Sequence, residues 1–315
     1  MVGYGRSVFV LFVFLCLDIL RCSSGVVTMT ELCKHPSAES EMRGPIICPK
    51  VAMSMWTCSR YASLESEVNT SIPSDGWEVE LTNLANLLYK NNHKIAFVGD
   101  SISLQMREMF KCSVLSTGKY EGDFNKYVIF HRSPLLSRLP EDYTYGPSDY
   151  NLDWLMSDLW AQYAIFDNVK YIVINTGAWW GYPRLHKWNQ PALKNTIQVA
   201  KLLKEHFKVG GRLWTLLTDL QMIYNMTIIW RDTAPAGICD LRKMKFKSTK
   251  YHYHEGLSML NEVGRQFISD LGGLVIPNIW ESSIHRWREH VGDHDRMHWC
   301  LYQSSSVPAA WNHEL

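Results

Sequence analysis

Short apolar runs alternate with longer amphipathic stretches over most of this chain, and this alternation limits the possible folds more than any other feature. Five runs have the length of buried strands: Ile95–Val98, Tyr127–Phe130, Tyr171–Ile174, Met226–Trp230 and Leu274–Ile276. The stretches between them predict four helices: Ile102–Cys112, Leu152–Phe166, Ala192–Phe207 and Gly256–Leu271. Strands that alternate with helices form a mostly parallel sheet that is covered on both faces. We therefore predict an α/β fold of three layers, α/β/α, around a mostly parallel five-stranded sheet.

A serine directly follows the first predicted strand. Gly99-Asp100-Ser101 lies between this strand and the first helix, so the Ser101 hydroxyl is expected on a sharp strand-to-helix turn. Backbone N–H groups are free at the start of a helix, and the helix dipole favours negative charge there. Such a turn suits attack on an ester carbonyl and stabilisation of the resulting oxyanion. Asp100 also has the side chain of a helix N-cap, which is a purely structural alternative for that residue.

Other polar residues follow later strands. Asn175 ends the third strand, and Asp295 and His298 come after the last. Sites in open α/β sheets form beyond the carboxyl ends of strands, so we expect these residues near Ser101 at one edge. His298 is the candidate base for Ser101, and Asp295 would orient its ring. Asn175 would donate a side-chain N–H to the oxyanion, beside the backbone N–H of Ser101.

Each of these residues also has a structural interpretation. An Asp-x-x-His pair is often a surface pair, and Asn175-Thr176-Gly177 is also typical of an ordinary strand-ending turn. A metal site is a further alternative, because His290, His294 and His298 recur at a spacing of four residues. Gly292 opposes the continuous helix that would align these rings. A second group of histidines and a glutamate lies within residues 252–255. We predict neither a metal nor a cofactor.

The same residues lie in blocks that resemble a known enzyme family. Gly99-Asp100-Ser101, Asn175-Thr176-Gly177 and Asp295-x-x-His298 resemble the serine, asparagine and Asp-His blocks of the SGNH (GDSL-type) hydrolases. More narrowly, the chain is similar to the PC-esterase group, which includes the plant trichome-birefringence-like polysaccharide O-acetyltransferases. The most specific match is Asp295-x-x-His298-Trp299-Cys300-Leu301, followed by Pro308-x-x-Trp311-Asn312. The resemblance covers roughly residues 93–315.

This resemblance implies an SGNH-like fold and a Ser-His-Asp mechanism of acyl transfer. Ser101 would carry a transient acetyl ester, His298 would move the proton and Asp295 would orient His298. The implied partners are an acyl donor and a polysaccharide or other glycan, whose hydroxyl accepts the acetyl group. In a carbohydrate acetyl-esterase, water would accept the acetyl group instead.

The chain departs from the family pattern at two positions. Arg296 stands where the terminal signature has a cysteine, and Ala178 replaces the histidine of an NTGHWW block. Transferase and esterase activities therefore both remain open, as does a non-catalytic glycan-binding protein on the same scaffold. Three residues near these blocks are candidate substrate-binding groups: Trp179, Trp180 and Arg231. For Arg231, a structural ion pair with Asp232 or another carboxylate is the alternative.

The N-terminus is typical of a signal peptide. Arg6 precedes the apolar stretch Val8–Leu17, and small residues follow near position 25. Asp18 makes this stretch short for a membrane span, although an uncleaved anchor facing the lumen is the alternative. We therefore expect a location in the secretory pathway, either secreted or in the Golgi lumen, with any membrane contact through this segment alone.

Cysteines and glycosylation patterns agree with that location. An even number of cysteines remains after removal of the signal peptide, and this suggests disulfides of undetermined pairing. The six cysteines are Cys33, Cys48, Cys58, Cys112, Cys239 and Cys300. Asn69-Thr70-Ser71 and Asn225-Met226-Thr227 have the pattern of N-glycosylation acceptors.

Local composition and the pattern of apolar runs divide the chain into three predicted segments. Residues 1–25 are the signal peptide or anchor, and residues 26–90 are expected to form an irregular, disulfide-tied segment that packs on the main domain. Residues 91–315 would form the catalytic domain. The formal net charge of +1 provides no basic footprint for nucleic acid, so we expect no nucleic-acid partner.

Overall fold

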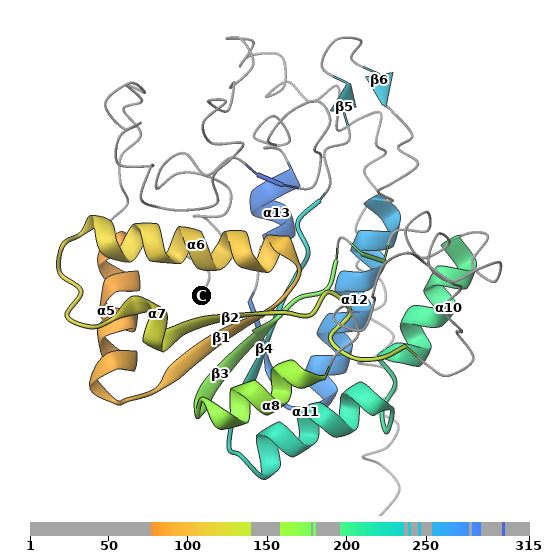
Figure 1. Cartoon of the computed structure of the whole chain (residues 1–315). Coiled ribbons are helices and arrows are strands. Elements are labelled where there is room, and N and C mark those ends of the chain that lie inside the picture. The colour runs from red at the N-terminus through yellow and green to blue at the C-terminus, as the bar shows by residue number, and fades with distance from the viewer. Residues whose placement is uncertain are drawn as a thin grey trace, which may run out of the picture.

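A five-stranded sheet forms the centre of the protein, and all of its strands are parallel (Figure 1). The computed structural model describes residues 77–139, 158–177, 179–180, 196–235, 239–240, 245–246, 254–276, 279–284 and 298–299. The strand order is β2-β1-β3-β4-β7. The strands are β1 (Lys94–Gly99), β2 (Val128–Arg132), β3 (Val169–Ile174), β4 (Thr227–Arg231) and β7 (Leu274–Ile276). This architecture confirms the predicted α/β fold with a parallel five-stranded sheet.

All five predicted strands are present, with ends that differ from the prediction by two residues at most. Strands of a parallel sheet are buried on both faces and therefore have nearly continuous apolar sequences. β1 illustrates this, because every residue after Lys94 is buried. Two further short strands, β5 (Cys239–Asp240) and β6 (Lys245–Phe246), pair antiparallel outside the main sheet.

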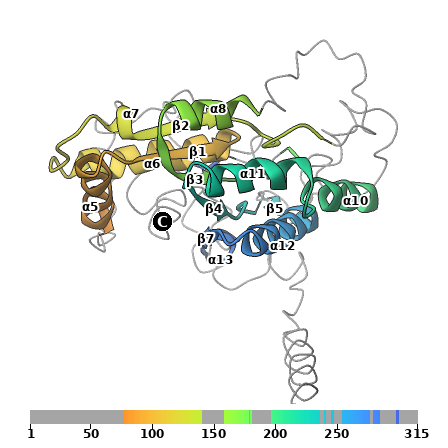
Figure 2. The same cartoon turned by 90° about the horizontal axis from the view of Figure 1, so that it is seen from below.

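Helices cover both faces of the sheet, and each face has its own apolar core (Figures 1 and 2). The helices of one face are α5 (Trp77–Lys90), α6 (Ser101–Ser116), α7 (Phe124–Tyr127) and α13 (Ile279–Ile284). Those of the other face are α8 (Leu159–Phe166), α10 (Thr196–His206), α11 (Arg212–Met222) and α12 (His254–Asp270). Successive side chains of a strand point to opposite faces, so Ile95 and Phe97 of β1 enter the first core, whereas Ala96 and Val98 enter the second.

Two long helices were absent from the prediction. Residues 26–90 were expected to be irregular, but α5 is a regular helix whose Leu81, Ala85 and Leu88 are buried in the first core. This spacing places the three side chains on one face, and acidic residues in the first turn with Lys90 in the last match the helix dipole. α11 buries one face through similarly spaced leucines. Residues 26–76 lie outside the described part of the chain.

The strand order reverses beside β1. β2 lies on one side of β1, and β3, β4 and β7 follow in turn on the other side. In doubly wound sheets, ligands bind beyond the carboxyl ends of the strands at such a reversal. β1 leads into Ser101 and β3 leads into Asn175, and the Asn175 N–H continues the ladder with a 3.0 Å bond to the Val98 carbonyl. The topology therefore places both predicted site residues at this position.

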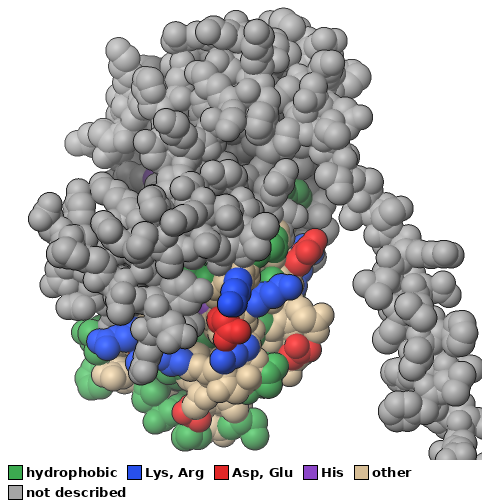
Figure 3. All heavy atoms as spheres, turned by 90° about the vertical axis from the view of Figure 1, so that its right-hand side faces the viewer, with side chains coloured by type: hydrophobic (Ala, Val, Ile, Leu, Met, Phe, Trp, Pro, Cys, Tyr) green, Lys and Arg blue, Asp and Glu red, His purple; other side chains and the backbone are tan. Residues whose placement is uncertain are grey.

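The surface on the α10 side mixes charges of both signs. Figure 3 shows lysine and arginine side chains interspersed with acidic ones on the described part of this side. Among the described residues of α10 and the turn after it, Lys208 and Glu205 form an ion pair whose charged atoms are 3.0 Å apart. This part of the surface thus presents no continuous basic patch.

A buried histidine makes the stability of this fold dependent on pH. His206 on α10 is 4% exposed, packs against Trp180 and Phe207, and hydrogen-bonds the Leu135 carbonyl through Nε2. Burial lowers the pKa of His206 to about 4, and the hydrogen bond opposes this shift only partly. The unfolded chain therefore takes up this proton at a higher pH than the folded chain, so stability is complete above about pH 6.5 and declines toward pH 4.

We expect His206 to account for a loss of about 2 kcal/mol in unfolding free energy between about pH 7.5 and pH 5. His206→Gln keeps a side-chain N–H donor but cannot titrate, so its stability should change less over this range. Urea unfolding of both proteins at the two pH values measures the difference. Equal pH dependence in the two proteins would contradict this account of His206.

Candidate active site

Ser101 and His298 are in direct contact at the carboxyl edge of the sheet. The Ser101 hydroxyl oxygen is 2.6 Å from His298 Nε2, although 197 positions separate the residues in the sequence. Both residues are partly exposed, so this contact is not sealed inside the core. With a hydrogen on Nδ1, the imidazole accepts the hydroxyl hydrogen at Nε2, which is the arrangement of a nucleophile and its base.

The turn before α6 fixes the position of Ser101. Gly99 has a φ of 155°, and a Cβ there would lie 2.3 Å from the Asn175 carbonyl oxygen, so only glycine fits. Asp100 is the N-cap, and its carboxylate accepts a 2.8 Å hydrogen bond from the Ile102 N–H. Ser101 is consequently the first residue of α6, where the helix provides no carbonyl partner for the backbone N–H. The capping interpretation of Asp100 is confirmed.

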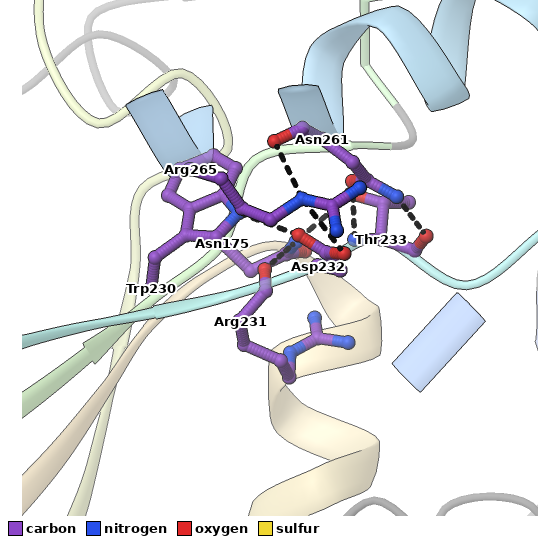
Figure 4. A network of polar contacts seen from close by, with 7 residues as sticks. All are labelled: Asn175, Trp230, Arg231, Asp232, Thr233, Asn261 and Arg265. Atoms are coloured by element: carbon purple, nitrogen blue, oxygen red, sulfur yellow. Dashed lines mark hydrogen bonds and ion pairs between the residues drawn. The ribbon is translucent and has the colours of Figure 1, made fainter. Parts of the chain in front are cut away.

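Asn175 ties the end of β3 to the end of β4. Its side-chain amide donates to the Arg231 carbonyl and to Thr233 Oγ1, each at 2.8 Å (Figure 4). Both amide hydrogens are therefore used within the protein. A role as an oxyanion donor would require Asn175 to give up one of these bonds, whereas the Ser101 backbone N–H has no bond to a carbonyl of its own helix to give up.

A buried asparagine of α12 holds the same edge. The Asn261 amide accepts from the Thr233 N–H at 2.7 Å and donates to the Thr233 carbonyl at 2.9 Å (Figure 4). Close approach also requires Gly177, because a Cβ there would lie 2.0 Å from Thr233 Oγ1. Asn261 was absent from the residues predicted for the site. The available signal was a polar residue four positions after Leu257, on the buried face of α12.

Arg231 is a buried cation behind the site. Its side chain is fully buried, and Nη2 lies 3.4 Å from Ser103 Oγ on α6. Burial lowers the pKa of Arg231 to about 10, and the negative charges of Asp100 and Asp232 oppose this shift. Figure 4 shows its guanidinium directed away from the Asn175–Thr233–Asn261 contacts. This placement favours the structural alternative for Arg231 over direct contact with a substrate.

The two candidate tryptophans differ in their surroundings. Trp180 is 3% exposed, donates from Nε1 to Thr176 Oγ1 at 2.7 Å, and packs against His206 and Phe207. The prediction of substrate contact is therefore corrected for Trp180, which is a core residue. Trp179 is partly exposed and keeps surface that a substrate could meet.

Several predicted residues have no described placement. Asp295 lies outside the described residues, as do residues 1–76, with Cys33, Cys48, Cys58 and Asn69, and Cys300 near the C-terminus. Cys112 on α6 is disulfide-bonded. Asn225 is exposed, with a φ of 52°, in the turn between α11 and β4, where a glycan could be attached.

Within the described ranges, no group of three or more histidine, cysteine or acidic residues is placed to bind a metal ion. His290 and His294 fall outside those ranges. Among the helices that the structure describes, none combines the length and the apolar character needed to cross a membrane.

No protein-family model matches the chain, and the search of curated proteins finds no match.

Proposed function

We propose that this protein is a serine-dependent acyltransferase that moves an acetyl group to a glycan hydroxyl through an acyl-enzyme. The observation that supports the proposal is the 2.6 Å contact between Ser101 Oγ and His298 Nε2. A serine hydroxyl is a poor nucleophile until a base removes its proton, and this distance lies within the range for proton transfer.

In the first half-reaction, Ser101 Oγ attacks the carbonyl carbon of an acetyl ester while its proton passes to His298 Nε2. The carbonyl oxygen becomes an oxyanion beside the first turn of α6, where the Ser101 N–H and the positive end of the helix dipole stabilise it. The bond to the leaving group then breaks. The proton on His298 passes to the departing oxygen, which leaves acetyl-Ser101 and a neutral imidazole.

In the second half-reaction, His298 removes the proton of an acceptor hydroxyl, and the acceptor oxygen attacks the acetyl carbon. The bond to Ser101 Oγ breaks, and Ser101 regains its proton from His298. Asp295 would orient and stabilise the imidazolium in both halves, as proposed from its spacing to His298. The glycan acceptor follows from the motif resemblance, whereas water as acceptor would make the protein an acetyl-esterase.

A single incubation distinguishes transfer of the acetyl group to a glycan from its hydrolysis by water. The full chain, produced in a secretory host, is mixed with an acetyl-ester donor and a panel of oligosaccharides. We expect a mass gain of about 42 Da for each acetyl group that replaces a hydroxyl hydrogen on a glycan. Free acetate without acetylated glycan would favour the esterase. Glycan binding without either product would contradict a catalytic function.

A further inference from the structure

We propose that Gln105 is a positioning residue that holds the His298 segment against α6. The Gln105 side-chain amide donates to the Trp299 carbonyl at 2.7 Å and accepts from the Trp299 N–H at 3.2 Å. One side chain thereby satisfies both backbone polar groups of the residue that follows His298. The catalytic consequence rests on the proposed function, whereas the docking contact does not.

The spacing on α6 matches the spacing of the docked segment. Gln105 follows Ser101 by four residues, so both side chains lie on one face of the helix, one turn apart. Ser101 contacts His298, and Gln105 contacts Trp299. Two neighbouring positions on one helix face therefore hold two consecutive residues of a segment that is almost two hundred residues away in sequence. α6 therefore carries the proposed nucleophile, Ser101, and also holds the segment that contains the proposed base, His298.

The burial of Gln105 and Trp299 fixes the position of this segment along α6. Gln105 is 2% exposed, and Trp299 is 1% exposed, with its indole in the same core as Ile102 and Met106 of α6. A buried amide that loses its partners costs more free energy than the bonds themselves contribute. A segment displaced along α6 would both leave the Gln105 amide without Trp299 and pull the indole out of the core. His298 is consequently held at one position relative to Ser101.

Base catalysis depends strongly on this position. A misplacement of about 1 Å can lower the rate of an enzymatic step by about a hundredfold. Methionine has nearly the length of glutamine but cannot form either bond to Trp299. We expect Gln105→Met to lower kcat for a small acetyl ester by about 10- to 100-fold, while KM changes by less than about twofold. A purely structural role would change the unfolding midpoint without this separation of kcat from KM.

The matched control is Gln266→Met, at an exposed glutamine of α12 whose side-chain amide donates to Asp270 one turn further along the same helix. Its kcat should equal that of the wild type. Gln105→Leu is the second variant, because it also removes both bonds to Trp299 while placing no polar atom in the core. It should lose activity as Gln105→Met does, and it carries the test if Gln105→Met does not fold. Unchanged kcat in a folded Gln105 variant would overturn the positioning role.

Amide hydrogen exchange tests the docking without reference to activity. We expect the Trp299 amide to exchange at least about tenfold faster in Gln105→Met than in the wild type, while amides in the middle of α6 are unchanged. Equal exchange at Trp299 would overturn the proposal. If the wild-type chain shows no acyl transfer but Trp299 exchange accelerates in the variant, the proposed function fails and the docking contact stands.

Discussion

Replacing Ser101 with alanine is expected to lower turnover of an acetyl ester by at least about a thousandfold, whether the acetyl group reaches a glycan or water. The substitution removes the only atom that can carry the acetyl group in the proposed mechanism. It also removes the hydrogen bond to His298 Nε2. Because Ser101 is partly exposed at the start of α6, we expect the fold and its unfolding midpoint to change little.

The matched control for this prediction is Ser113→Ala on the same helix. Ser113 lies about three turns after Ser101 along α6. It is buried, and its hydroxyl donates to the Met109 carbonyl. This variant should keep wild-type turnover, with at most a small loss of stability. Steady-state kinetics of the three proteins with one ester make the comparison. Activity in Ser101→Ala within about tenfold of the wild type would exclude a covalent mechanism at this residue.

The largest effect on stability is expected for Gly264→Ala on α12. A Cβ at this position would lie 2.0 Å from Cζ2 of Trp230, which is fully buried on β4. Alanine normally favours a helix over glycine by about 1 kcal/mol. Here the helix must instead shift away from the sheet, and we expect a net loss of about 3 kcal/mol in unfolding free energy.

Denaturant unfolding measures this loss, and a second substitution tests its cause. The atoms nearest to the added methyl group belong to the six-membered ring of the Trp230 indole. In a Trp230→Phe background, Gly264→Ala should therefore cost less than it does alone, because the smaller ring leaves room. Increased stability of the single variant Gly264→Ala would contradict the close packing of α12 on β4.

The fold was predictable because the strands of a parallel sheet are buried on both faces and therefore appear in the sequence as continuous apolar runs. Runs such as Ile95–Val98 and Tyr171–Ile174 have the length and the continuous apolar character of strands that are buried on both faces, and all five runs are strands. α5 and α11 were missed although their buried leucines follow a helical spacing. The apolar runs do not predict the order of the strands in the sheet, because this order depends on which strands pair with each other.

The contact between Ser101 and His298 was predictable from the positions of the two residues rather than from composition. Ser101 follows a strand directly, and the order of Ser101 and His298 along the chain matched a recognisable set of blocks. The supporting contacts were not predictable in the same way. The contacts of Asn261 and Gln105 were not predicted, because each side chain bonds a backbone group that is distant in the sequence. Such contacts depend on how helices dock, which local patterns do not specify.

Labelling with a fluorophosphonate tests the central claim most directly, because this probe reacts covalently with a serine that a neighbouring base activates. The wild-type chain, Ser101→Ala and His298→Ala are each incubated with the probe, and the modified peptide is identified by mass. The account predicts modification at Ser101 in the wild type, none in Ser101→Ala, and a strongly reduced rate in His298→Ala. No modification of Ser101, or an undiminished rate without His298, would contradict it.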